Sequence, residues 1–261
     1  MALSIETCAA QHIGDRKEQQ DRVGIFAHPT RKGLLLAVLA DGMGGHTGGA
    51  LAAEQVVHSA RTNFDGFGIA EPPRDMLAAS IRDGHDGIKL TRYTSEQDPH
   101  STACVLVLQP GRADWAHCGD SRIYHFRDGK LVARTQDHSY VGDLIRKGYL
   151  TEEQAEKHPN KNILLSCLGE PEPPQIDFGE TAPLVAGDCF LLCSDGLWAY
   201  FTVDEIARVV TEFPPRQAAE IFINTARDRA QGRGDNCSLA IVRLKEVEKP
   251  ATPSVGRNKA A

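Results

Sequence analysis

Residues 34–53 read LLLAVLADGMGGHTGGALAA and join three different kinds of sequence. The first seven residues are apolar, which is typical of a buried strand. Asp41 comes next, followed by a glycine-rich loop and an alanine-rich stretch that favours a helix. A strand, a glycine loop and a helix also form the phosphate-binding turn of nucleotide-binding folds. The stretch therefore leaves two alternatives, a nucleotide cradle or a turn that presents the carboxylate of Asp41.

The spacing of the glycines argues against the nucleotide cradle. A dinucleotide fingerprint on this loop needs glycine at positions 42, 44 and 47, but position 47 is threonine. A P-loop needs Gly-Lys-Ser/Thr, which this loop lacks. Two helix-like segments follow where a βαβ unit would return to a strand. The loop is better explained as a turn that presents the carboxylate of Asp41.

Composition and charge limit which kinds of protein this chain can be. The chain has 261 residues, of which 41% are hydrophobic and 25% charged, so it can build one substantial core. A net charge of -6 argues against nucleic acid or an anionic membrane as partner. The sequence shows neither a bilayer-spanning apolar stretch nor a signal peptide, and its seven cysteines include no CxxC pair. We therefore expect a cytoplasmic protein with reduced thiols, and a monomer is the default expectation.

The order of strand and helix signals predicts one α+β domain that ends at about Leu244. Two strands form a hairpin and two helices follow, after which four short strands read as one antiparallel meander. A polar excursion, another buried strand, two more helices and a last strand complete the domain, and residues 244–261 are expected to form a disordered tail. In chain order the predicted segments are 23–26, 33–41, 48–64, 76–93, 101–111, 112–120, 121–130, 131–138, the excursion 139–175, 188–196, 203–213, 215–230 and 236–244.

Acidic residues recur at the ends of apolar strands. Asp41, Asp120 and Asp195 each end an apolar run beside a tight turn, and Asp235 stands just before the last strand. One such aspartate is usually a turn residue, but four like charges at one sheet edge repel unless a cation neutralises them. Carboxylate oxygens suit Mg²⁺ or Mn²⁺, whereas the usual zinc motifs are absent. Two such ions about 3.5–4 Å apart can activate a water and clamp a phosphoryl oxygen.

A phosphate-hydrolysing site also needs a fixed cation for its substrate. Arginine offers a two-pronged donor for phosphate oxygens, and Arg16 in GDRKEQQD is the candidate. A solvated surface arginine is the alternative.

Eight motifs in order resemble those of one known family. Together they are similar to the metal-dependent serine/threonine protein phosphatases of the type 2C (PPM) group, in their compact bacterial form. The resemblance covers residues 3–243. The motifs are GDRKEQQD (14–21), LADGMGGHTGG (39–49), STACVL (101–106), HCGDSRIYHFRDGK (117–130), TQDHS (135–139), NILLSCLG (162–169), LLCSDGLW (191–198) and GDNCSLAIV (234–242).

The resemblance implies a fold and an activity. The fold is a four-layer α-β-β-α sandwich of two antiparallel sheets flanked by helices, with a metal site in the cleft at one end. The activity is hydrolysis of phosphoserine and phosphothreonine by direct attack of water activated by a binuclear Mg²⁺ or Mn²⁺ centre. The excursion 139–175 would match the mobile flap that borders the cleft. The substrates would be signalling proteins phosphorylated by a bacterial-type serine/threonine kinase.

By motif match, the resemblance also implies roles for single residues. Asp41 would bridge the two ions and position the attacking water, and the Gly42 carbonyl would bind one ion. Asp195 and Asp235 would complete the ligands of the first ion. Asp120 would serve a third, weaker ion.

Further roles follow from the same match. Arg16 would hold the substrate phosphate. The Arg-x-x-x-Glu-Asp motif reads Gln20-Asp21 at its end, so a neutral amide replaces the glutamate that helps to hold the second ion. We expect weaker binding there, with Gln20 and Asp21 in the outer coordination shell. Met43 stands where some members carry a histidine, and His46 in the same loop is a candidate proton donor.

Two other functions remain open at this point. The chain could be a catalytically weak, phosphatase-like regulatory module, which only Gln20 favours. It could also act on a small phosphorylated metabolite, because the metal site would look the same.

Overall fold

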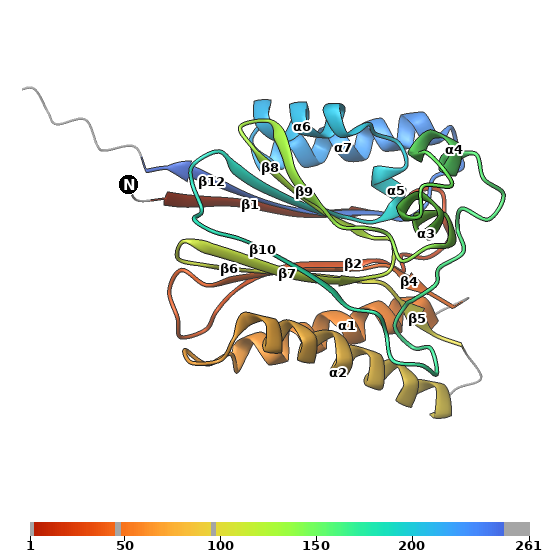
Figure 1. The fold of residues 1–261 in the computed structure, drawn as a ribbon, viewed down its shortest axis with the longest axis horizontal. Helices are drawn as coiled ribbons and strands as arrows, with labels where there is room; N and C mark the ends of the chain where they lie inside the picture. The colour runs from red at the N-terminus through yellow and green to blue at the C-terminus, as the bar shows by residue number, and fades with distance from the viewer. Residues whose placement is uncertain (1–2, 45–47, 95–97, 248–261) are drawn as a thin grey trace, which may run out of the picture.

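Two five-stranded antiparallel sheets form the centre of the molecule (Figure 1). The computed structural model describes residues 3–44, 48–94 and 98–247. The sheets have the strand orders β1-β12-β11-β8-β9 and β10-β7-β6-β3-β2, and β4 pairs with β5 separately. The strands are β1 (Leu3–His12), β2 (Arg22–Ala27), β3 (Leu35–Ala40), β4 (Gly42–Met43), β5 (His100–Ser101), β6 (Ala103–Gln109), β7 (Arg112–Cys118), β8 (Arg122–Arg127), β9 (Lys130–Arg134), β10 (Asp177–Thr181), β11 (Asp188–Cys193) and β12 (Cys237–Glu246).

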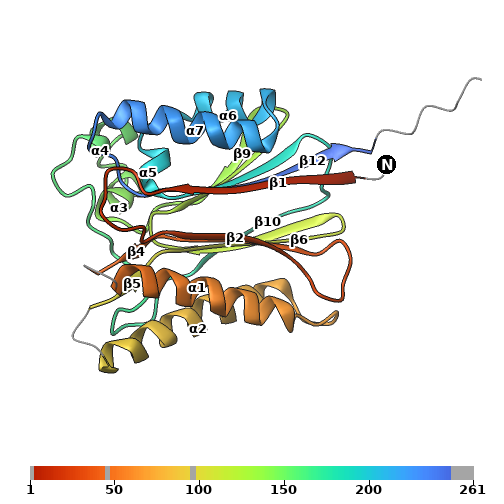
Figure 2. The same ribbon diagram turned by 180° about the vertical axis from the view of Figure 1, so that it is seen from behind.

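Helices cover the outer face of each sheet, as Figures 1 and 2 show from opposite sides. Helices α1 and α2 pack on the second sheet, and α6 and α7 pack on the first. This confirms the predicted α+β sandwich of four layers. The helices are α1 (Gly48–Asp65), α2 (Pro73–Thr94), α3 (Tyr140–Arg146), α4 (Glu152–Glu156), α5 (Asp195–Trp198), α6 (Val203–Glu212) and α7 (Pro215–Ala230).

Three apolar clusters separate the four layers. Phe64 of α1 lies in the cluster under the second sheet, Leu106 and Phe190 lie between the sheets, and Phe222 of α7 lies above the first sheet. All four side chains are fully buried, and each contributes roughly 1.5–3 kcal/mol of transfer free energy. Strands β3, β6 and β11 are apolar on both faces because each separates two of these clusters.

The prediction of one meander through residues 101–138 is wrong at a single place. Strand β6 pairs with β7 and β8 with β9, but β7 and β8 belong to different sheets. The chain crosses between the sheets at 119–121, where Gly119 adopts a φ of +104°. A period-two pattern marks strands but carries no information on which sheet each strand joins. The crossing places Asp120 at the end shared by both sheets.

Several elements lie outside the predictions, among them the two-residue strand β4. Strand β1 pairs with β12 along its full length and alternates between half-buried and exposed residues, so its sequence is too polar to stand out. Strand β10 adds to the edge of the second sheet, and α5 begins directly after β11. The prediction of a disordered tail is wrong for Leu244–Glu246, which belong to β12, with Leu244 buried. Residues 248–261 lie outside the described residues.

The segment 139–175 runs from the first sheet to helix α2 across the end of the sandwich. Ser139 caps α3 and bridges to Leu164. Leu168 bridges to Ser101, and the Gly169 N–H donates to His85 Nδ1 on α2 at 3.2 Å. Figure 1 shows α3, α4, α5, β4 and β5 at this same end. None of the helices among the described residues combines the length and apolar character needed to cross a bilayer.

Candidate active site

Four strand ends bring the predicted aspartates together. Asp41 lies between β3 and β4, and Asp120 lies at the crossing from β7 to β8. Asp195 opens α5 after β11, and Asp235 directly precedes the Asn236–Cys237 entry into β12. The charge of each of the other three acts on the carboxyl of Asp41. All four side chains are half-buried, so the site is open to solvent.

Hydrogen bonds to Ser101 and Thr102 hold the backbone N–H and carbonyl of Asp41. Its N–H donates to Thr102 Oγ1 at 3.0 Å, and its carbonyl accepts from the Thr102 N–H at 2.8 Å. The Ser101 hydroxyl also donates to this carbonyl, at 3.1 Å. These three bonds hold the backbone of residue 41 and do not involve its carboxylate.

Gly42 is required by the tight packing behind it. A Cβ at this position would lie 1.9 Å from the carbonyl oxygen of Gly49 and 2.7 Å from that of Gln20. A Cβ on Gly49 would lie 2.9 Å from Gln20 Cδ. The turn after Asp41 thus packs directly against Gln20, which places this residue beside the Gly42 backbone.

Asp21 is a fifth carboxylate of the cluster and is fully buried. The Ser194 hydroxyl donates to its Oδ2 at 2.8 Å. Its Oδ1 is buried with no hydrogen-bond partner among the described residues. Burial raises the pKa of Asp21 to about 7. A buried acceptor without a donor fits a site that takes up a cation and its water.

Asp235 pairs with Arg16 at the exposed side of the site. Arg16 Nη2 lies 2.5 Å from Asp235 Oδ2, and 61% of the arginine side chain is exposed. The sequence predicted both residues but not Asn236, which holds the Arg16 loop in place. Asn236 accepts from the Gln20 N–H at 2.7 Å and donates to the carbonyls of Ile13 and Glu18 at 2.8 and 3.0 Å. The one sequence feature that could have identified Asn236 as a site residue is its position directly after Asp235.

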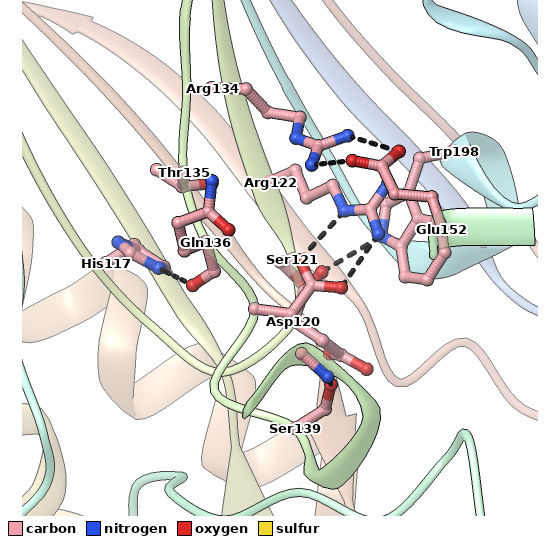
Figure 3. A network of polar contacts seen from close by, with 12 residues as sticks. His117, Asp120, Ser121, Arg122, Arg134, Thr135, Gln136, Ser139, Glu152 and Trp198 are labelled. Atoms are coloured by element: carbon pink, nitrogen blue, oxygen red, sulfur yellow. Dashed lines mark hydrogen bonds and ion pairs between the residues drawn. The ribbon is translucent and has the colours of Figure 1, made fainter. Parts of the chain in front are cut away.

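A second network fixes Asp120 (Figure 3). The Trp198 indole donates to the Asp120 carbonyl at 3.0 Å, and the Arg122 guanidinium lies 3.6 Å above the Trp198 ring. Arg122 also binds both oxygens of Asp137, at 2.8 and 2.7 Å. Arg122, Trp198 and Asp137 lie in three of the motifs but were not predicted as site residues.

The electrostatics of the cluster fit a hard cation. Burial and the charges of Asp21 and Asp195 raise the pKa of Asp41 well above its ordinary range. Burial, then the charge of Asp195, raises the pKa of Asp120 to about 8, and burial, then Asp235, raises that of Asp195 to about 6. Holding these negative charges close together in a partly buried site costs free energy until protons or cations neutralise them. Its donors are oxygens, which suit Mg²⁺ or Mn²⁺.

These shifts predict how the stability of the metal-free protein depends on pH. The folded-state pKa values of Asp21, Asp120 and Asp195 exceed the ordinary value, so the folded chain binds more protons than the unfolded chain. We expect the unfolding temperature after EDTA treatment to rise as the pH falls from about 8 to about 5.5. Saturating Mg²⁺ should flatten this dependence. A metal-free protein that gains stability as the pH rises over this range would contradict it.

His46, the candidate proton donor, lies outside the described residues. Its role therefore stays a prediction.

Comparisons with known proteins agree with the fold. A sequence model of the protein phosphatase 2C family matches residues 8–230. Protein phosphatase PhpP of Streptococcus pneumoniae serotype 2 is 34% identical over 252 residues, which cover 95% of this chain and 99% of that protein.

Two solved structures are similar over nearly their whole length. The S. agalactiae serine/threonine phosphatase has a TM-score of 0.84 at 32% identity and covers 93% of this chain and 100% of its own. The catalytic domain of the serine/threonine protein phosphatase PstP, in complex with two manganese ions, has a TM-score of 0.79 at 26% identity and covers 94% and 100%.

Proposed function

The chain belongs to the protein phosphatase 2C family, and from this premise we propose how its carboxylate cluster works. Its activity is that of a metal-dependent protein serine/threonine phosphatase. The observation that supports placing the reaction at this cluster is that burial and the charges of four other aspartates raise the pKa of Asp41 at the shared end of both sheets. A solved relative with two manganese ions supports a divalent cofactor.

We assign the ligands by motif match to the family, and the proximity of these carboxylates supports the assignment. Asp41 would bridge two ions because it is central among the other carboxylates. The Gly42 carbonyl would approach one of them, and Asp195 and Asp235 would complete the other. When bound, two such ions supply Lewis acidity that activates water and offsets charge on the phosphoryl group. Asp120 would serve a third, weaker ion.

Arg16 would orient the phosphate group. Its exposed guanidinium stands at the open side of the cluster, where Asp235 and the Asn236 network fix its loop. An arginine fork can bind two phosphate oxygens at once and so orient the phosphorus atom. Binding the substrate here would bring the phosphoester beside Asp41.

Phosphorylated proteins are the substrate class that the family implies. We propose that they are products of a bacterial-type serine/threonine kinase and that the phosphatase acts as a monomer. All seven cysteines are unpaired in the structure, which suits a reducing compartment such as the cytoplasm.

Gln20 gives a prediction about the second ion. The Gln20→Glu variant would add a carboxylate beside Gly42, so we expect its apparent Mn²⁺ affinity to rise severalfold with little change in maximal rate. Asp21 would act with it in the outer coordination shell. Metal titration of activity for wild type and variant measures this. Equal apparent affinities would mean that residue 20 does not act on the ion.

A direct assay tests the proposed function. The purified protein should release phosphate from a phosphothreonine peptide with Mn²⁺ and stop when EDTA is added. Activity should return when Mn²⁺ is restored in excess. Hydrolysis that persists in EDTA would contradict the metal-dependent mechanism. A preference for small phosphorylated metabolites over phosphopeptides would favour the metabolite alternative.

A further inference from the structure

A second set of ligand-type side chains meets where β5 approaches the end of the segment 139–175. His100 Nδ1 lies 3.9 Å from Cys167 Sγ and 3.7 Å from Glu170 Oε1, and the sulfur and carboxylate atoms are 3.7 Å apart. The three atoms thus form a nearly equilateral triangle. Its centre lies about 2.2 Å from each corner, close to the Zn–N, Zn–O and Zn–S bond lengths of about 2.0–2.3 Å.

A fourth residue orients the histidine. Asp98 Oδ1 lies 3.2 Å from His100 Nε2, on the opposite side of the ring from Cys167 and Glu170. A proton on Nε2, donated to Asp98, leaves the Nδ1 lone pair facing the thiol and the carboxylate. Histidines that bind metals almost always donate their other N–H to a carboxylate, carbonyl or water. The contact with Asp98 supplies the partner that a metal-binding histidine usually has.

We propose that His100, Cys167 and Glu170 bind one transition-metal ion of the zinc class, separately from the aspartate cluster. Cys167 is 6% exposed, whereas 47% of the Glu170 side chain is exposed, so an ion can enter from the Glu170 side and keep a water as its fourth ligand. A thiolate and an imidazole favour Zn²⁺ or Co²⁺ over Mg²⁺ and Mn²⁺. The sulfur and nitrogen donors therefore give this site a stronger preference for Zn²⁺ or Co²⁺ than the all-oxygen aspartate cluster has.

Binding an ion at this site costs the proton of the Cys167 thiol. Burial, then the Glu170 carboxylate, raises the pKa of the Cys167 thiol to about 12. The thiol is protonated without an ion, and binding must displace that proton.

The site joins two parts of the fold. His100 pairs with Met43 of β4, just after Gly42, and Leu168 bridges to Ser101. A bound ion would tie residues 167–170 to β5 and, through the β4–β5 pair, to the turn after Asp41.

Cobalt is a direct probe because only a thiolate ligand gives an intense charge-transfer band in the near ultraviolet. We expect metal-free wild-type protein to develop this band with about one Co²⁺ per chain. Cys167→Ser should abolish it, and Glu170→Gln and Asp98→Asn should weaken the affinity about 10-fold or more. Zn²⁺ should bleach the band, and a large excess of Mg²⁺ should not.

Two cysteine variants serve as matched controls. Cys8→Ser removes the half-buried thiol of β1, and Cys118→Ser removes a buried thiol of β7; both should keep the band. The exposed Glu170→Gln change tests the site without disturbing the core if Cys167→Ser does not fold. Absence of the band in wild type, its persistence in Cys167→Ser, or equal bleaching by Mg²⁺ would overturn the proposal and leave the cluster a set of weak hydrogen bonds.

Discussion

Replacing Asp41 with asparagine is expected to lower the rate of phosphopeptide hydrolysis by roughly 10³-fold. The amide keeps the shape of the side chain but removes the charge that would bridge two ions. The bonds to Thr102 and Ser101 involve the backbone of residue 41, so they survive the change. Steady-state rates at saturating Mn²⁺ measure the effect.

The unfolding temperature shows whether the Asp41→Asn variant has lost activity because it no longer folds. Because the charges of Asp21 and Asp195 act against the Asp41 carboxylate, the metal-free Asp41→Asn protein should unfold at the same temperature as wild type or higher. Asp228→Asn, an exposed change on α7, is the matched control and should leave activity unchanged. If Asp41→Asn stayed within about tenfold of the wild-type rate, a barrier change of only about 1.4 kcal/mol, Asp41 would have no bridging role.

Removing the Arg16 side chain should give the second largest effect. We expect Arg16→Ala to lower kcat/KM for a phosphothreonine peptide by roughly 10²-fold, because a charged donor to the phosphate is lost. The kcat/KM of Arg16→Lys should lie between those of the wild type and Arg16→Ala, since lysine keeps the charge but not the two-pronged donor. The exposed ion pair with Asp235 contributes only about 0–1 kcal/mol to folding, so the variants should remain folded.

Lys17 is the matched control for Arg16. It is an exposed cation in the same loop, so Lys17→Ala tests whether any positive charge there suffices. Equal losses in Arg16→Ala and Lys17→Ala would show a general charge effect on substrate approach. Such an effect should also vanish at high salt, whereas a bound phosphate contact should persist.

The sequence predicted the aspartate cluster more fully than it predicted how the strands around the cluster pair. Asp41, Asp120 and Asp195 follow apolar runs, and such runs mark buried strands whatever their partners. Which strands pair is decided by contacts between distant segments, so the crossing at Gly119 could not be seen in a local pattern. Strand β1 stayed hidden for a related reason, because an edge strand with half-exposed faces needs few apolar residues.

The residues that hold the site were the hardest to predict. Asn236 acts through backbone groups of the Arg16 loop, more than 200 positions earlier in the chain. Arg122 packs on Trp198, which donates to the Asp120 carbonyl, and Asp137 holds Arg122 in place; these residues are close only in the folded chain. Polar residues in such roles have ordinary turn or surface patterns, so only the three-dimensional arrangement identifies them.

Manganese binding to the metal-free protein tests the central assignment most directly. Titration followed by the electron paramagnetic resonance signal of free Mn²⁺ should show two bound ions per wild-type chain, the second held more weakly than the first, and at most one in Asp41→Asn. The oxygen preference of Mn²⁺ keeps the Cys167 cluster out of this count. Wild-type protein that binds no Mn²⁺ tightly, or an Asp41→Asn variant that still binds two ions as tightly as wild type, would contradict a binuclear centre bridged by Asp41.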